Sequence, residues 1–372
     1  MNIAIVCYHS LGGSGIIAYE LGAELARLGH RIHFLGLEPP FRMRDIQENV
    51  MFHTVEVKDY PVFTYPPYTL SLASRLYEVI EQYNIDVVHC HYAVPHAVAG
   101  LLARDMCSCD VKVVTTLHGT DITLVGSHPS FYSITKHAIE HSDCVTAVSD
   151  YLKCRTEEVF DIEPGKIVRI YNFISEKMLS GAANSTCFDE KRCGKNIIIH
   201  ASNLRAVKQP LHLIRIFAEV CRCLPGESEL WILGDGPLKR DMQRLADNMG
   251  IGDAVSFFGV TSNPEMIFGC ADIFLLTSRE ESFGLAALEA MACSTAVVSY
   301  RTGGIPEIVT DECGILCEPG DEEGMARACA ELLQDKNRLN RMKNSARSRA
   351  VEDFSGDTVI KEYVALCEKI AE

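Results

Sequence analysis

Short apolar runs rich in β-branched residues alternate with helical patterns through both halves of this 372-residue chain. This alternation strongly constrains the fold, because parallel neighbouring strands need a crossover connection that is usually a helix. In the first half we predict strands over residues 2–7, 31–37, 51–57, 87–91, 111–117 and 144–148. The helical patterns between them cover residues 14–28, 69–83, 96–104, 132–141 and 150–159. The sequence therefore predicts an α/β protein with parallel sheets.

The same alternation restarts in the second half, after a polar and aperiodic segment at residues 175–195. The second series of predicted strands covers residues 197–201, 229–233, 255–258, 273–276 and 296–299. Its predicted helices cover residues 209–223, 238–249, 263–270, 284–292, 324–333 and 358–371. A chain of this length is too long for one ordinary core.

We therefore predict two Rossmann-like domains whose parallel sheets face each other across a ligand-binding cleft. The predicted boundaries are residues 1–174 for the N-terminal domain, 175–195 for a linker and 196–354 for the C-terminal domain. Residues 355–372 form a last helix, which we expect to pack back toward the N-terminal domain.

The formal net charge of −15 argues against nucleic acids and anionic membranes as partners. No apolar run approaches the roughly 20 residues that span a bilayer, and the N-terminus lacks the basic region of a signal peptide. We expect a cytoplasmic protein without stable membrane association, and leave a homodimer open.

The sixteen cysteines, which include the pairs Cys107/Cys109 and Cys221/Cys223, show no C-x-x-C spacing. We interpret most of them as small buried side chains in a reducing compartment.

Glu281 and Glu289 lie eight positions apart, around the residues Phe283, Gly284 and Leu285. We predict that a helix begins near Gly284, which leaves Glu281 in the loop before it and Glu289 inside it. The first amides of such a helix are unpaired and attract an anion. The arrangement therefore suits a ligand with a sugar, phosphates and a ribose.

Basic and glycine residues follow the preceding strands of the second half. Arg205 and Lys208 come after the strand at residues 197–201, where they can neutralise a diphosphate leaving group. Asn203 lies in the same loop, and Gly234 begins a Gly-Asp-Gly-Pro turn after the next strand. These loops are predicted to meet at one edge of the sheet.

The first strand is followed by a glycine-rich loop that fits a second interpretation. Gly13, Gly15 and Ala18 match the dinucleotide fingerprint, and Glu38 stands where a ribose-binding acid belongs, as in an NAD-dependent enzyme. A lone match of this kind is weak, because many tight strand-to-helix turns need such glycines. Since the second half already offers a nucleotide site, we assign this loop to the acceptor and pyrophosphate side of the cleft.

Together these segments resemble the retaining GT-B glycosyltransferases, which share the E-x7-E motif, and the resemblance covers essentially the whole chain. The strings at residues 63–68, 89–96 and 115–123 resemble more narrowly the members that attach N-acetylglucosamine to L-malate at the start of bacillithiol biosynthesis. The resemblance implies UDP-N-acetylglucosamine as donor, L-malate as acceptor and front-face transfer. It departs from the family in one respect: the arginine usually precedes the lysine by four or five positions, so either Asn203 or Arg205 contacts the phosphate.

The resemblance also assigns roles to residues. The predicted catalytic residues are His118, Arg205, Lys208 and Glu281. The predicted donor-binding residues are Gly13, Gly15, Asn203, Gly234, Phe283, Gly284, Leu285 and Glu289. The predicted acceptor-binding residues are Ser14, Tyr92, Thr116 and Lys136, with Arg42 in reserve. No D-x-D triplet occurs in the chain, so we predict no metal and no cofactor.

Three other interpretations stay open at this point. They are a related transferase with a lipid acceptor, a UDP-sugar 2-epimerase and a non-catalytic protein that binds a nucleotide sugar. His89 and His91 could hold a metal only if His96 or His118 supplied a third ligand, an arrangement that we do not favour.

Overall fold

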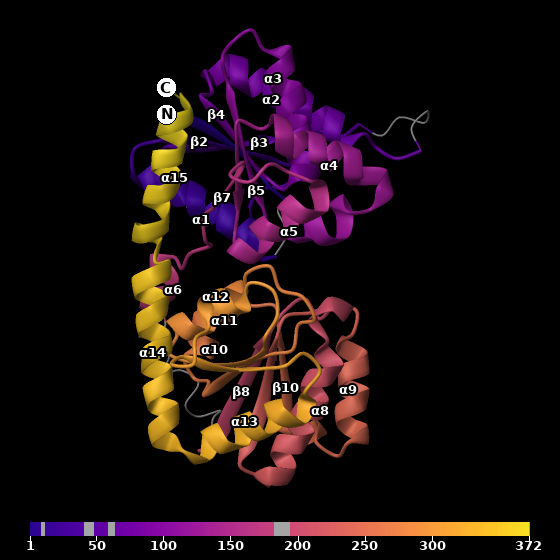
Figure 1. Cartoon of the computed structure of the whole chain (residues 1–372), viewed down its shortest axis with the longest axis vertical. Coiled ribbons are helices and arrows are strands. Elements are labelled where there is room, and N and C mark those ends of the chain that lie inside the picture. Colours follow the sequence, from indigo (N-terminus) through magenta and orange to yellow (C-terminus); the bar gives the residue numbers. More distant parts are fainter. Residues whose placement is uncertain (9–11, 41–47, 59–63, 182–193, 372) are drawn as a thin grey trace. The chain divides into compact units, whose positions relative to one another are not determined.

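The computed structural model describes residues 1–8, 12–40, 48–58, 64–181 and 194–371. The chain divides into two compact units (Figure 1). The N-terminal unit combines residues 1–172 with residues 357–372, and the C-terminal unit covers residues 173–356. Both units are α/β, as the alternating pattern predicts. No helix in the described part of the chain combines the length and the apolar character needed to cross a membrane.

The N-terminal unit is built on a parallel sheet in the order β3-β2-β1-β4-β5-β6-β7. Its strands are β1 (Asn2–Val6), β2 (Arg31–Gly36), β3 (Val50–Thr54), β4 (Val87–His91), β5 (Lys112–Leu117), β6 (Cys144–Ala147) and β7 (Ile167–Arg169). The strand order reverses between β1 and β4, so the loops after these two strands leave toward opposite faces. Ligands bind at such a point in open α/β sheets.

Helices return the chain between these strands and cover both faces of the sheet. They are α1 (Gly13–Arg27), α2 (Tyr68–Tyr83), α3 (Val98–Met106), α4 (Pro129–His141) and α5 (Asp150–Phe160), with the short helical segments η1 (Ala93–Ala97) and η2 (Asp121–Gly126). The last helix, α15 (Gly356–Ala371), belongs to this unit from residue 357 onward. Its Tyr363 is buried and bonds to the side chains of Thr116 and Thr146.

The C-terminal unit has a second parallel sheet in the order β10-β9-β8-β11-β12-β13. Its strands are β8 (Asn196–Ala201), β9 (Ser228–Leu233), β10 (Val255–Gly259), β11 (Ile273–Leu276), β12 (Ala296–Tyr300) and β13 (Gly314–Cys317). Its helices are α6 (Glu176–Gly181), α8 (Pro210–Cys223), α9 (Lys239–Asn248), α10 (Pro264–Phe268), α11 (Leu285–Ala292), α12 (Ile305–Ile308), α13 (Glu322–Gln334) and α14 (Lys336–Phe354). Two short turns of its described part are η4 (Ala206–Lys208) and η5 (Gly252–Ala254).

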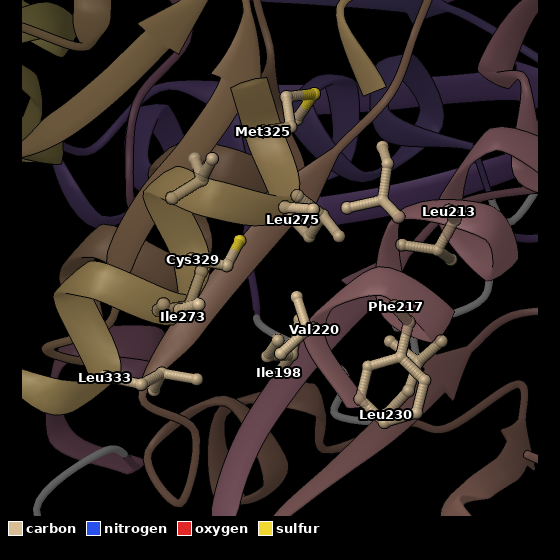
Figure 2. Packing of buried hydrophobic residues seen from close by; sticks show 14 of the residues in the cluster. Ile198, Leu213, Phe217, Val220, Leu230, Ile273, Leu275, Met325, Cys329 and Leu333 are labelled. Atoms are coloured by element: carbon tan, nitrogen blue, oxygen red, sulfur yellow. The ribbon is translucent and has the colours of Figure 1, made fainter. Parts of the chain in front are cut away.

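One face of this second sheet packs against α8 and α13 (Figure 2). Alternate residues of each strand, such as Ile273 and Leu275 of β11, point to this face because side chains in a strand alternate. Helix α8 contributes Leu213, Phe217 and Val220, which are spaced by about one helical turn. Burial of this cluster stabilises the sheet whose carboxyl edge carries the loops described below.

Several elements of the structure differ from the prediction. Strands β7 and β13 were missed because most of their residues are only partly buried or exposed, so they give no continuous apolar run. Helix α14 was missed because its sequence is rich in charge, and only five of its nineteen residues form the buried stripe. Residues 176–181 of the predicted linker form α6, whose buried Met178 contacts the thiol of Cys293.

The cysteines also divide differently from our interpretation. Of the fourteen described, the structure buries six, leaves five half-buried and exposes three, and all fourteen are free thiols. Cys329 is fully buried in the cluster of Figure 2, as we interpreted it. The exposed cysteines Cys109, Cys154 and Cys223 do not fit the interpretation as buried apolar side chains.

Candidate active site

The carboxyl edge of the N-terminal sheet gathers polar side chains from the loops after β1, β4 and β5. Ser14 lies in the first turn of α1, and its hydroxyl is hydrogen-bonded to the Tyr92 hydroxyl. Tyr92 follows β4 and has a φ of 90°, a conformation that side chains other than glycine rarely adopt. Burial raises the pKa of Tyr92, so its hydroxyl stays protonated at neutral pH. The structure thus brings together two of the predicted acceptor-binding residues.

Four histidines lie beside this pair and form what we call the histidine cluster: His89, His91, His96 and His118. The Nδ1 atom of His91 lies 2.9 Å from Nε2 of His118, so one ring donates to the other. Burial lowers the pKa of His118 to about 3 and that of His96 to about 4. The rings are therefore neutral at physiological pH, and Nδ1 is the remaining ring nitrogen that His118 can offer to a ligand.

The sequence prediction did not include Asp121, which holds this edge together. Its carboxylate accepts hydrogen bonds from the backbone amides of His118 (3.1 Å), Gly119 (2.9 Å) and Ala93 (3.1 Å). Burial raises its pKa to about 6, although these three hydrogen bonds oppose the shift. Asp121 therefore ties the loop after β5 to the loop after β4. The sequence feature that could have indicated this role is the position of Asp121 three residues after His118, from which its carboxylate can accept hydrogen bonds from the loop amides.

Not every predicted acceptor residue joins this group. Thr116 is fully buried, and its hydroxyl is hydrogen-bonded to Nε2 of His89 (2.7 Å) and to the hydroxyl of Thr146 (2.7 Å). It therefore orients His89 of the histidine cluster and does not face a ligand. Lys136 does not join the group, because its amine donates to the carbonyl of Asp161, the residue after α5. That end of α5 lies at the opposite edge of the sheet, since return helices run antiparallel to the strands. Arg42 lies outside the described residues.

The start of α1 provides a positive partial charge at the same edge. The residue before the helix is Gly12, whose carbonyl accepts the amides of Gly15 and Ile16, and no side chain caps the helix. The amides of Gly13 and Ser14 precede the first bonded turn and are oriented along the helix axis. They form the type of site that binds carboxylate or phosphate oxygens.

In the C-terminal unit, the side chains of Lys208 and Glu281 meet at the carboxyl edge of the sheet. The Lys208 amine donates to the Glu281 carboxylate at 2.6 Å, and the two side chains are 21% and 15% exposed. His200, at the end of β8, is buried nearby, and burial lowers its pKa to about 4. The structure thus joins two predicted catalytic residues that are 73 positions apart in the chain.

Backbone contacts fix the loop that carries Glu281. The amide of Arg279 donates to the carbonyl of Val207 (2.9 Å), and the amide of Gly304 donates to the carbonyl of Glu281 (2.9 Å). Gly303 has a φ of 56°, and a Cβ atom there would lie 1.8 Å from the Glu281 carbonyl oxygen. Only glycine fits at this position, which explains a turn to which the sequence alone gave no role.

Helix α11 begins immediately after the Glu281 loop. Gly284 precedes it with a φ of 99°, and no side chain caps the helix start at Leu285. Phe283 is buried against the ring of Phe354 in α14, so it can contact a ligand only through its backbone. Glu289 is partly exposed and lies one turn inside the helix. The predicted placement of Glu281 before the helix and Glu289 within it is what the structure shows.

The remaining predicted donor residues lie in the loops after β8 and β9. Asn203 and Arg205 are both exposed, and Leu204 between them is buried with a φ of 43°. A Cβ atom on Gly234 would lie 1.9 Å from the carbonyl oxygen of Ser202. Gly234 is therefore required for the close approach of these two loops, and its contact with a donor stays a prediction.

Comparisons with known proteins agree with this architecture. Residues 11–177 match the model of Glycosyltransferase Family 4, and residues 188–349 match that of Glycosyl transferases group 1. The chain is 40% identical to N-acetyl-alpha-D-glucosaminyl L-malate synthase of Bacillus anthracis, over 98% of this chain and 95% of the relative. It is 26% identical to the uncharacterized glycosyltransferase MJ1607 of Methanocaldococcus jannaschii, over 98% and 97% of the two chains.

Solved structures show the same fold at lower identity. Sucrose-phosphate synthase of Thermosynechococcus elongatus aligns with a TM-score of 0.84 at 19% identity, covering 100% of this chain and 99% of the other. Anabaena Alr3699/HepE in complex with UDP-glucose aligns with a TM-score of 0.81 at 18% identity, covering 99% and 100%. These matches, with the two parallel sheets and the relative at 40% identity, show that the chain belongs to the GT-B glycosyltransferases.

Proposed function

We propose that this chain transfers N-acetylglucosamine from UDP-N-acetylglucosamine to the hydroxyl of L-malate, as the first step of bacillithiol biosynthesis. The observation that carries the proposal is the 40% identity, over nearly the whole of both chains, to an N-acetyl-alpha-D-glucosaminyl L-malate synthase. A neighbour of the same fold that was solved with UDP-glucose supports a uridine diphosphate sugar as the donor class.

In this proposal the C-terminal unit binds the donor. Lys208 and Glu281 neutralise each other in the structure described here, and both are partly exposed. A bound donor would separate this ion pair. Its diphosphate would accept hydrogen bonds from the Lys208 ammonium group, and hydroxyls of its sugar would donate to the Glu281 carboxylate. The uncapped start of α11 and the exposed Arg205 add positive charge for the phosphates, and Glu289 binds the ribose hydroxyls.

The N-terminal unit binds the acceptor. The carboxylates of malate suit the amides of Gly13 and Ser14 together with the hydroxyl of Tyr92. These groups take the place of Lys136, which is engaged elsewhere. His118 offers Nδ1 to a hydroxyl of the donor sugar, because its Nε2 is held by His91.

The reaction then proceeds with retention and without a metal. The bond from the anomeric carbon to the phosphate breaks, and the malate hydroxyl attacks from the same face of the sugar. The departing phosphate oxygen accepts the hydroxyl proton, so no protein nucleophile is needed. The contribution of the protein is positioning and stabilisation of the negative charge that develops on UDP, a task for Lys208 and the amides of α11.

The test is UDP release from UDP-N-acetylglucosamine in excess EDTA, with L-malate or with succinate. Succinate is the matched control because it has the two carboxylates of malate but lacks the hydroxyl that attacks. Release with malate alone supports the acceptor and the metal-free reaction. Release only with another acceptor would contradict the malate assignment. Tight UDP binding without UDP release in the presence of any acceptor would favour the non-catalytic interpretation. Selective NADH binding would favour the interpretation as an NAD-dependent enzyme.

A further inference from the structure

Two thiols and a carboxylate converge at the amino edge of the N-terminal sheet. They are Cys107, Cys109 and Glu81, whose ligand atoms all lie within 4.8 Å of one another. Glu81 is in the last turn of α2, shortly before β4, and the two cysteines stand between α3 and β5. Strands β4 and β5 are neighbours in the sheet, so the topology brings the three side chains together. We call them the thiol–carboxylate cluster.

The local backbone holds both thiols on one side of the chain. Cys107 ends α3 in an extended conformation (φ −80°, ψ 152°), and its amide donates to the carbonyls of Ala103 and Arg104. Ser108 and Cys109 then form a bend, and the side chains of Cys107 and Cys109 are hydrogen-bonded to each other. The amide of Val111 donates to the carbonyl of Cys109 at 3.2 Å, which closes the following turn. Little reorganisation would be needed for the two thiols to share one ligand.

The second C-x-C pair of the chain lacks this geometry. Cys221 and Cys223 lie near the end of α8, where residues two apart do not face each other. Their accessibility resembles that of the first pair, because one thiol of each pair is half-buried and the other exposed. The chain therefore contains a matched control for the effect of geometry on two closely spaced thiols.

Among the described residues, the charged groups that act on the Cys107 thiol are Cys109 and Glu81. Burial, Cys109 and Glu81 together raise the pKa of the Cys107 thiol to about 12, with burial as the largest cause. The nearest basic residues in sequence are engaged elsewhere, since Arg104 pairs with Asp143 and Lys112 with Asp110. Each of the three groups becomes an anion when it loses its proton, so a bound cation would relieve the repulsion between them.

We propose that the thiol–carboxylate cluster binds one thiophilic divalent cation of the zinc and cadmium class. Thiolate sulfur and carboxylate oxygen are both ligands of such ions, and three protein ligands leave a fourth, solvent-facing position. The ion displaces the thiol protons, which leave to solvent, so binding strengthens as the pH rises. By joining the end of α2 to the end of α3, the ion stabilises the N-terminal unit.

This site is separate from the proposed transferase reaction. Tyr92 and His118 of the candidate active site follow the carboxyl ends of β4 and β5, whereas the cluster precedes the amino ends of the same strands. A five-residue strand spans roughly 16 Å at about 3.3 Å per residue. Substitutions in the cluster should therefore leave malate-dependent UDP release unchanged.

The test is a cadmium titration of the reduced, metal-free, full-length protein, followed by thiolate-to-cadmium absorbance and by elemental analysis after dialysis. The wild type should bind one more equivalent than the C107S/C109S variant, and that equivalent should raise the melting temperature by several degrees. The C221S/C223S variant should keep this equivalent. Glu81→Gln should weaken it at least tenfold, because the carboxylate is a ligand.

Three results would overturn the proposal. They are equal binding by the wild type and C107S/C109S, loss of the equivalent in C221S/C223S, and unchanged affinity in Glu81→Gln. Circular dichroism of each variant establishes that it is folded, and the half-buried to exposed thiols make the serine substitutions mild. Since UDP release is measured on the same samples, failure of the metal site and failure of the transferase proposal are distinguishable.

Discussion

Gly303→Ala should displace the loop that carries Glu281. A Cβ atom at this position would lie 1.8 Å from the Glu281 carbonyl oxygen, and real Cβ contacts are at least 3.0 Å, so the two must separate by about 1.2 Å. The neighbour is backbone rather than a flexible side chain, so the loop itself has to move. The hydrogen bond from the Gly304 amide to the same oxygen would weaken with it.

The structure also gives the expected magnitude. The φ of 56° costs an alanine about 1–2 kcal/mol, and overpacking adds about 1–3 kcal/mol. We therefore expect the free energy of unfolding of the C-terminal unit to fall by about 2–5 kcal/mol. A displacement of about 1 Å at the proposed catalytic carboxylate of Glu281 should lower kcat roughly 100-fold in the fraction that remains folded.

Gly320→Ala is the matched control, because Gly320 has a φ of 89° but no atom within 4 Å of its ideal Cβ position. It should show the backbone cost alone, about 1–2 kcal/mol, with full activity. Urea unfolding followed by tryptophan fluorescence reports on the C-terminal unit, since the single tryptophan is Trp231 in β9. Equal destabilisation by the two alanines, with wild-type kcat in both, would refute the reasoning.

Other predictions concern charge, pH and the acceptor. Lys208→Met should lower kcat/KM for UDP release about 100- to 1000-fold. Lys195→Met is the control, because it breaks a similar ion pair with Glu229 (2.8 Å) in the same unit and should leave kcat/KM unchanged. Equal losses of kcat/KM in the two variants would contradict the role assigned to Lys208. The urea midpoint of the N-terminal unit should fall between pH 6.5 and 4, because the histidine cluster binds protons more weakly when folded than when unfolded. Asp121, whose pKa is raised to about 6, has the opposite effect on the midpoint, but it is a single group and the histidine cluster has four. A urea midpoint that rises on acidification would show that the histidine cluster is charged. Tyr92→Phe should raise KM for malate and leave KM for UDP-N-acetylglucosamine unchanged, and steady-state kinetics with each substrate varied would detect the opposite result.

Alternation of apolar strands and amphipathic helices was sufficient to predict two parallel α/β sheets. Parallel strands buried on both faces give continuous apolar runs, and β4 and β11 were predicted with the bounds that the structure shows. Elements without such a signal were missed: β7 is three residues long, and α14 presents a narrow buried stripe among many charged residues. In these elements the tertiary contacts, rather than local preference, determine the conformation.

For the candidate site, the sequence indicated residue types and loops but not partners. It predicted that Glu281 precedes a helix and that Lys208 follows a strand, because both features depend on local sequence. The tertiary structure alone decided three contacts. These are the ion pair of Lys208 with Glu281, the hydrogen bond between His91 and His118, and the hydrogen bond from Lys136 to the carbonyl of Asp161. Each depends on which strand ends lie side by side and which way a helix returns, and both are set by packing of the whole sheet.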